Sequence, residues 1–198
     1  MEGTYTFVQL LVLIIARSLQ VSVPILLIMK LRHVAWADYG FVRFRPVRDV
    51  LVAIGLTAAG YFAYYTAAIL LHNIGFDFSG DFDAIPQITT EASISLVTIT
   101  LIMMASVANG FAEELAMRSY LLTRLADLFG SKIVAVVATS VLFAAYHSYQ
   151  GRYGVFSALM IGVVFGIYFA KTNRFWPVMI AHFIMDAFPL TLIAAGAE

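Results

Sequence analysis

Two adjacent carboxylates and an arginine stand at the end of a long apolar run, in the segment 110–118. Glu114 and Arg118 are four residues apart, so on a helix they share a face and can form an ion pair. Glu113 is turned about 100° away from Glu114 and shares a face with Asn109 instead. A charged group at the centre of a membrane helix costs roughly 2.5–3.5 kcal/mol on insertion scales. We therefore interpret Glu114 as structural and Glu113 as the carboxylate that is free for chemistry.

Two histidines lie on later apolar runs, each with a polar or aromatic residue at helical spacing. His147 follows Phe143 by four residues, and His182 precedes Asp186 by four. His182 and Asp186 can hydrogen-bond on one face, which would fix the imidazole tautomer. Each pair alone is a weak signal. With Glu113 they place a carboxylate base, two imidazoles and a second carboxylate on three helices, which is sufficient for hydrolysis by activated water.

The composition is that of a membrane protein with several spans. The chain is 62% hydrophobic and only 12% charged, with a mean hydropathy of +0.89. Soluble domains have roughly 45–50% apolar and 25% charged residues. The formal net charge is zero, so no nucleic-acid partner follows from it. The chain has no cysteine, which excludes disulfide and thiolate chemistry.

Apolar runs of about 20 residues predict an all-α transmembrane bundle of about six spanning helices. The expected spans are 7–29, 50–71, 92–111, 133–149, 154–170 and 175–195. A short amphipathic helix, 118–132, is expected after the third span. We interpret 1–198 as a single membrane domain, with a catalytic core at 94–192 and two additional spans in 1–91. Arg17, inside the first span, is expected to snorkel or to pair with a neighbouring helix.

The loops predict the orientation of the chain in the membrane. Ten of the twelve Lys and Arg residues lie in the first, third and fifth connections, whereas the second and fourth carry only Arg152. By the positive-inside rule, the odd connections are cytoplasmic and both termini face outward. We therefore expect a multi-pass protein of the cell membrane.

The three motifs together resemble a known family. The order Glu-Glu-x-x-x-Arg, Phe-x-x-x-His and His-x-x-x-Asn/Asp, each on a hydrophobic helix, resembles the CPBP family, which includes CAAX prenyl endopeptidases and bacteriocin-processing, Abi-type proteins. The resemblance covers roughly 94–192, and the first two spans match only in being hydrophobic. Asp186 stands where the prenyl endopeptidases carry Asn, although Asp occurs in the wider family.

This resemblance implies an intramembrane glutamic endopeptidase. Glu113 would be the general base that activates water, and His147 would position that water or shuttle its proton. His182 and the residue at 186 would stabilise the oxyanion. An ionised Asp186 cannot donate a hydrogen bond as an Asn amide would. We therefore expect Asp186 to orient His182 and favour its protonated form, which leaves His182 as the donor.

The other motif residues are expected to have a structural role around the four catalytic candidates. They are Glu114, Arg118, Asn109 and Phe143. The implied partners are the lipid bilayer and a membrane-embedded or lipidated peptide substrate, with a membrane protein as a further candidate partner. No nucleic acid and no cofactor are expected.

The hypothesis imposes a geometric condition. If the third and fourth spans cross as simple antiparallel helices, Glu113 lies near the cytoplasmic end and His147 near the outer end. A shared water then requires the third span to begin later, so that Glu113 is deep, or the fourth to begin well after Lys132. A separation above about 10 Å between Glu113 and His147 would exclude a shared water.

Two alternatives remain open at this stage. Glu113, His147 and His182 form a two-His-one-Glu set that could hold zinc with an open fourth position, although no His-Glu-x-x-His motif is present. The second alternative is non-catalytic: a membrane scaffold, an immunity or partner-stabilising protein of the same fold, or a small transporter. No internal repeat of the kind typical of transporters is visible.

Overall fold

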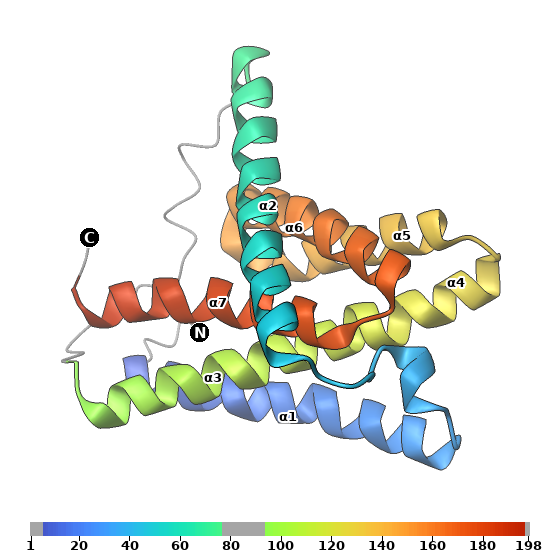
Figure 1. The fold of residues 1–198 in the computed structure, drawn as a ribbon. Coiled ribbons are helices and arrows are strands. Elements are labelled where there is room, and N and C mark those ends of the chain that lie inside the picture. The colour runs from blue at the N-terminus through green and yellow to red at the C-terminus, as the bar shows by residue number, and fades with distance from the viewer. Residues whose placement is uncertain (1–5, 77–93, 197–198) are drawn as a thin grey trace.

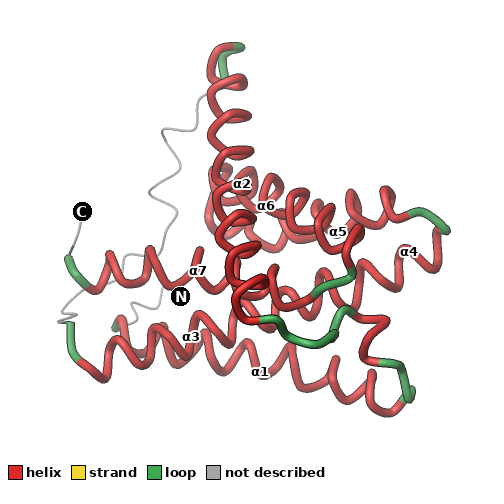
Figure 2. Tube along the Cα trace, viewed as in Figure 1, coloured by secondary structure: helices red, strands yellow, loops and turns green. Residues whose placement is uncertain are grey.

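Every element that the structure describes is helical (Figures 1 and 2). The computed structural model describes residues 6–76 and 94–196. In this part of the chain, five helical stretches are long and apolar enough to cross a membrane: Phe7–Leu31, Pro46–Asn73, Leu96–Phe129, Lys132–Thr172 and Phe175–Ala194. The predicted all-α membrane bundle is confirmed.

Helices α1 (Phe7–Leu31) and α2 (Pro46–Asn73) correspond to the first two predicted spans. The short helix η1 (Trp36–Tyr39) lies between them. Pro46 occupies the start of α2, where its missing N–H would have no partner within the helix anyway. Helix α2 crosses the other helices steeply, and its C-terminal half extends beyond them (Figure 1).

The third span is much longer than predicted. Helix α3 (Leu96–Glu114) continues without a break into the π-helix η3 (Leu115–Leu122) and then into α4 (Thr123–Phe129). The predicted end at Phe111 and the separate amphipathic helix are therefore wrong, and the predicted start at Ala92 lies outside the described residues. No proline or glycine interrupts 111–129, so nothing in the local sequence stops the helix. Gly130, with φ of 65°, ends it.

The fourth and fifth predicted spans form a helical hairpin. Helices α5 (Lys132–Tyr146) and α6 (Gly151–Thr172) pack against each other and are joined by η4 (His147–Gln150). A Cβ at Gly162 would lie 3.2 Å from the Cα of Ser140, so the glycine permits this close approach. Helix α5 has only 15 residues, or about 22 Å. That is shorter than a hydrocarbon core of about 30 Å, so the turn at its end need not reach the far surface.

Helix α7 (Phe175–Ala194) packs along α3, which in turn packs along α1 (Figure 1). Gly110 is the point of close approach between α3 and α7. A Cβ added there would lie 3.1 Å from the Phe183 nitrogen and 3.4 Å from the His182 Cβ. The small residue one turn before the acidic pair therefore brings α7 within reach of it.

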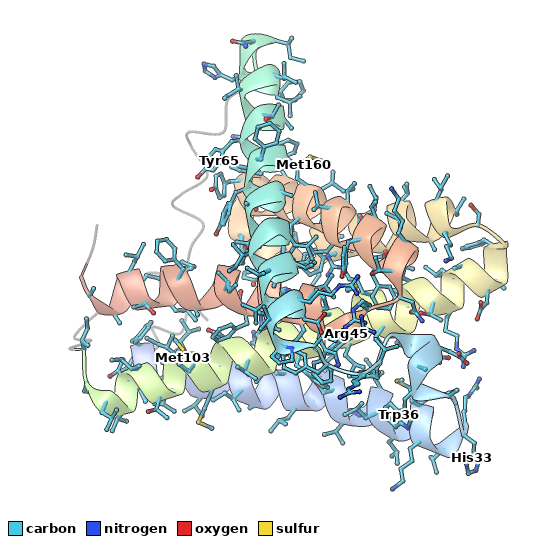
Figure 3. All side chains as sticks on the ribbon, in the orientation of Figure 1. His33, Trp36, Arg45, Tyr65, Met103 and Met160 are labelled. Carbon is cyan, nitrogen blue, oxygen red and sulfur yellow. The ribbon has the colours of Figure 1, made fainter. Side chains whose placement is uncertain are left out.

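The basic connections gather at one end of the molecule. Arg174 Nη2 donates to both carboxylate oxygens of the buried Asp49, at 2.8 and 2.9 Å. Ser119 Oγ donates to the Tyr39 carbonyl at 2.6 Å. In the same region, Arg45 lies among densely packed side chains at the start of α2 (Figure 3). These bonds join η1 to η3, and the start of α2 to the residue that precedes α7.

Candidate active site

The predicted pair of Glu114 and Arg118 is present and fully buried. Arg118 Nη1 donates to Glu114 Oε1 at 2.7 Å, and the two side chains are 2% and 0% exposed. The guanidinium carbon of Arg118 also lies 4.5 Å from the centre of the Phe143 ring, a distance typical of a cation–π contact. Arg118 lies in the π-helix that begins directly after Glu114. Such wide turns occur frequently at functional sites.

Glu114 has a second partner that the sequence did not predict. The Nδ1 atom of His182 lies 2.7 Å from Glu114 Oε1. Because an ionised carboxylate only accepts hydrogen bonds, Nδ1–H is the donor, and the charged acceptor makes this bond strong. Glu114 therefore binds two side chains: the imidazole of His182, which lies on α7, and the guanidinium of Arg118, which lies one turn further along its own helix.

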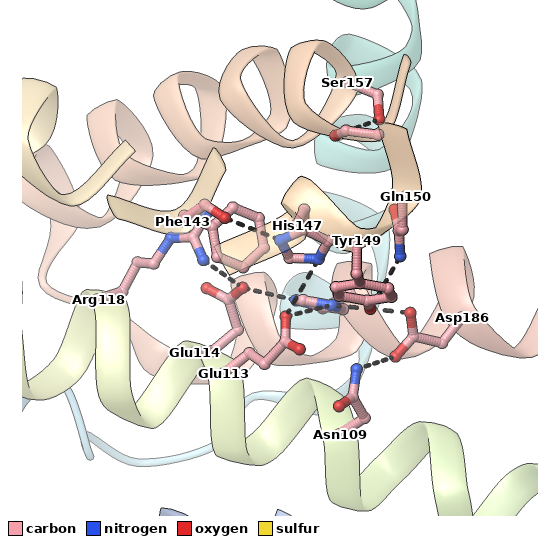
Figure 4. A network of polar contacts seen from close by, with 12 residues as sticks. Asn109, Glu113, Glu114, Arg118, Phe143, His147, Tyr149, Gln150, Ser157 and Asp186 are labelled. Carbon is pink, nitrogen blue, oxygen red and sulfur yellow. Dashed lines mark hydrogen bonds and ion pairs between the residues drawn. The ribbon is translucent and has the colours of Figure 1, made fainter. Parts of the chain in front are cut away.

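Asp186 lies on the opposite side of His182. Its Oδ1 atom is 3.7 Å from His182 Nε2, which is too long for a hydrogen bond. Its Oδ2 atom accepts a hydrogen bond from Asn109 Nδ2 at 3.0 Å (Figure 4). Glu114 rather than Asp186 therefore fixes the tautomer of His182, and the predicted hydrogen bond between His182 and Asp186 is wrong. The predicted effect of Asp186 on the charge of the ring stays a prediction. The four-residue spacing of His182 and Asp186 brings their side chains near each other without a direct bond.

His147 is oriented by the backbone of its own helix. Its Nδ1 atom lies 2.8 Å from the Phe143 carbonyl oxygen, which can only accept, so Nδ1–H donates. The ring also packs on Phe143, with 4.5 Å between centroids. In a neutral imidazole, the remaining atom, Nε2, is then an acceptor, and it points toward Glu113 (Figure 4).

Glu113 Oε2 is the point on which both histidines converge. It lies 3.5 Å from His182 Nε2 and 3.9 Å from His147 Nε2. This oxygen is buried and has no hydrogen-bond partner in the described protein, a state that is costly unless a ligand or water satisfies it. The 3.9 Å distance is far below the separation that would exclude a shared water. The long third helix explains it, because Glu113 lies near the middle of the stretch Leu96–Phe129.

A cavity of about 190 Å³ is lined by Glu113 and His147, and it includes residues that sequence reasoning missed. Besides the predicted Glu113, Asn109, His147 and Asp186, its lining residues are Ile14, Arg17, Ala105, Tyr146, Tyr149 and Gln150. Tyr149 lies over His147, with ring centroids 6.1 Å apart, and its hydroxyl accepts a hydrogen bond from Gln150 at 3.0 Å. The proximity of Tyr149 and Gln150 to the His147 motif was the signal available in the sequence.

Glu113, His147 and His182 are also side chains of the types that bind zinc. Among the described residues, no group of three or more His, Cys, Asp or Glu side chains is arranged to hold a metal ion. Both imidazole rings are engaged through Nδ1, His182 with Glu114 and His147 with the Phe143 carbonyl, which leaves each Nε2 facing Glu113. That engagement would orient ligands as well as it would orient bases.

The fold and the site define a class: a membrane protein with an acid–histidine cluster buried between its helices. Within the chain, residues 95–188 match the family model of type II CAAX prenyl endopeptidase Rce1-like proteins. This segment contains every predicted site residue, and the match confirms the resemblance seen in the motifs. No curated protein and no solved structure gives a significant match.

Proposed function

We propose that this protein is a glutamic intramembrane endopeptidase that hydrolyses a peptide bond in a membrane-associated or lipidated substrate. The observation that carries the proposal is the convergence of two imidazole Nε2 atoms on one oxygen of Glu113, at 3.5 and 3.9 Å. Glu113 is a lining residue of a cavity, and that oxygen lacks a hydrogen-bond partner in the described protein. A carboxylate with an open lone pair beside an accessible space is the arrangement that a general base requires.

The proposed reaction begins with a water held between Glu113 and His147. A water about 2.8 Å from each of two atoms fits an edge of 3.9 Å between them. Glu113 takes a proton from this water, and the water oxygen adds to the carbonyl carbon of the scissile bond. When the intermediate collapses, the C–N bond breaks and the proton passes to the amine nitrogen. Each product then carries one part of the water.

His182 is the proposed donor to the oxyanion. Its Nδ1 is fixed by Glu114 at 2.7 Å, so a proton on Nε2 faces the site. Carboxylates of Glu113 and Asp186 also lie within 4 Å of this ring. In a low-dielectric site these negative charges attract an imidazolium, which is the form that can donate from Nε2. A preformed donor of this kind is typically worth a factor of about 10²–10³ in kcat.

The membrane orientation belongs to the same proposal. We place the basic connections at the cytoplasmic face and both termini outside, in a cell membrane. Hydrogen bonds between these connections support a common face for them, including Asn173 to the Ala37 carbonyl at 2.8 Å and Lys132 to the Ala170 carbonyl at 2.8 Å. The positive-inside rule assigns that face to the cytoplasm. The substrate would then reach Glu113 from within the bilayer.

The test is a comparison of membrane peptides in cells that carry the wild-type protein or Glu113→Gln. Substrates are identified by peptide termini that are present in wild-type cells and absent from Glu113→Gln cells. These termini should persist in cells with the matched control Asp127→Asn. Asp127 is an exposed carboxylate of α4 outside the cavity. If the biological phenotype survives in cells where Glu113→Gln accumulates normally, the scaffold alternative replaces catalysis.

A metal-dependent form of the reaction is the second candidate, since the same three side chains are zinc-ligand types. Elemental analysis of the purified protein, paired with chelator treatment, separates the two. We expect cleavage to persist in protein that contains less than one-tenth of an equivalent of zinc (roughly the level of adventitious metal). Loss of cleavage on chelation, with recovery on adding zinc, would favour the metal mechanism.

A further inference from the structure

Arg17 lies deep in the membrane-spanning part of α1, where a free cation needs an explanation. It is the eleventh residue of a helix that runs from Phe7 to Leu31, so it lies about 15 Å from the first residue. A long side chain cannot reach the membrane surface easily from there. An arginine facing lipid at that depth costs roughly 2.5–3.5 kcal/mol on insertion scales.

The expected partner of Arg17 is missing from the described part of the chain. No hydrogen bond or ion pair involves its guanidinium there, and the side chain is exposed. Arg118 and Arg174 differ, because each has a carboxylate at 2.7 or 2.8 Å. The expectation that Arg17 snorkels or pairs with a neighbouring helix therefore finds no pairing partner among the described residues, and it stays a prediction.

Arg17 instead lines the same cavity as Glu113. It lies on α1, which packs along α3, and Ile14 lines the same cavity one helical turn earlier. One wall of the cavity thus combines an apolar residue with a cation, whereas the proposed catalytic groups lie on α3, η4 and α7. Neither carboxylate of this cavity forms an ion pair with Arg17 in the described structure: Asp186 accepts from Asn109, and Glu113 faces two histidines.

We infer that Arg17 binds an anionic group of the substrate, a carboxylate or a phosphate, and so selects substrates that carry one beside an apolar chain. This inference rests on the proposed function, because it takes the bound molecule to be the substrate. The binding of the anion itself does not depend on catalysis. A guanidinium presents a planar set of donors that matches carboxylate and phosphate oxygens in pairs. Residues 95–188 match the family model, so α1 adds this feature to the site from outside that segment.

The test measures binding of three amphiphiles with the same twelve-carbon chain. Laurate carries a carboxylate, dodecyl phosphate carries a phosphate, and lauramide is neutral. The proteins are wild type, Arg17→Gln, Arg17→Lys and the matched control Lys171→Gln, an exposed cation at the end of α6. Native mass spectrometry of proteins released from phosphatidylcholine nanodiscs counts the molecules bound and gives their affinities.

We expect wild type and Lys171→Gln to bind the anions at least about tenfold more tightly than lauramide, as hydrogen bonds to a charged group typically allow. Arg17→Gln should reduce this preference to about one, and Arg17→Lys should keep only part of it. Tighter binding of laurate indicates a peptide carboxylate, and tighter binding of dodecyl phosphate indicates a lipid phosphate. An equal preference in wild type and Arg17→Gln, or none in wild type, overturns the inference. Loss of cleavage in Glu113→Gln bears on the proposed function alone, because these affinities are measured without cleavage.

Discussion

The two adjacent glutamates have different environments, and the difference predicts different mutant phenotypes. Glu114 neutralises Arg118 at 2.7 Å and is completely buried. Breaking a buried pair leaves an uncompensated charge and typically costs about 3–5 kcal/mol. We expect Glu114→Gln to lower the midpoint of thermal unfolding in detergent strongly, and Glu113→Gln to leave it almost unchanged while abolishing cleavage. Equal unfolding midpoints for the two variants would contradict this division of roles.

Asp186 provides a second test at the level of single residues. Since Glu114 rather than Asp186 holds His182 Nδ1, an amide at 186 would keep the ring in place and add a donor near Nε2. The loss of the negative charge weakens the attraction for the imidazolium, whereas the new amide donor offsets that loss, so we expect Asp186→Asn to keep kcat within a few-fold of wild type in a cleavage assay. Asp186→Leu, which leaves the Asn109 amide without its acceptor, should lose activity. A large loss in Asp186→Asn would show that the negative charge itself is required.

At the scale of elements, the approach of α3 and α7 decides whether the site forms. The contact at Gly110 has almost no spare room, since an added Cβ would lie 3.1 Å from a backbone nitrogen of α7. We expect Gly110→Ala to push the helices apart by a few tenths of an ångström and to lower kcat at least tenfold, because small misplacements are costly in catalysis. Gly55→Ala in α2, where no atom lies within 4 Å of the new Cβ, is the matched control. Full activity in Gly110→Ala would mean that the spacing of these helices is not critical.

Contacts within one helix could be predicted from the sequence, whereas contacts between helices could not. The motifs and the 3.6-residue period correctly placed Glu114 beside Arg118 and His147 beside Phe143, because those pairs lie within one helix or its end. The bond between Glu114 and His182 joins residues 68 positions apart and depends on how α7 packs on α3. Helical period carries no information on such packing. The π-helix at Leu115–Leu122 likewise contains no proline or glycine that would have predicted it.

The whole molecule has its basic connections at one end, which predicts a testable orientation. The chain contains no cysteine, so single cysteines can be introduced without removing any. We expect Lys171→Cys and Asp127→Cys to react with a membrane-impermeant maleimide only from the cytoplasmic side. His72→Cys, at the far end of α2, should react only from the outside. Labelling of all three positions from one side would contradict the proposed arrangement of the spans.

Cleavage by purified protein measures the central claim most directly, namely that Glu113 is the general base. Wild type, Glu113→Gln and the control Asp127→Asn are reconstituted in liposomes with a substrate from the peptide comparison, and the initial rate of product formation is recorded. General-base catalysis contributes a factor of about 10²–10⁴. The account predicts that Glu113→Gln falls at least about 100-fold below wild type while Asp127→Asn matches it. A Glu113→Gln protein that cleaves within a few-fold of the wild-type rate would contradict it.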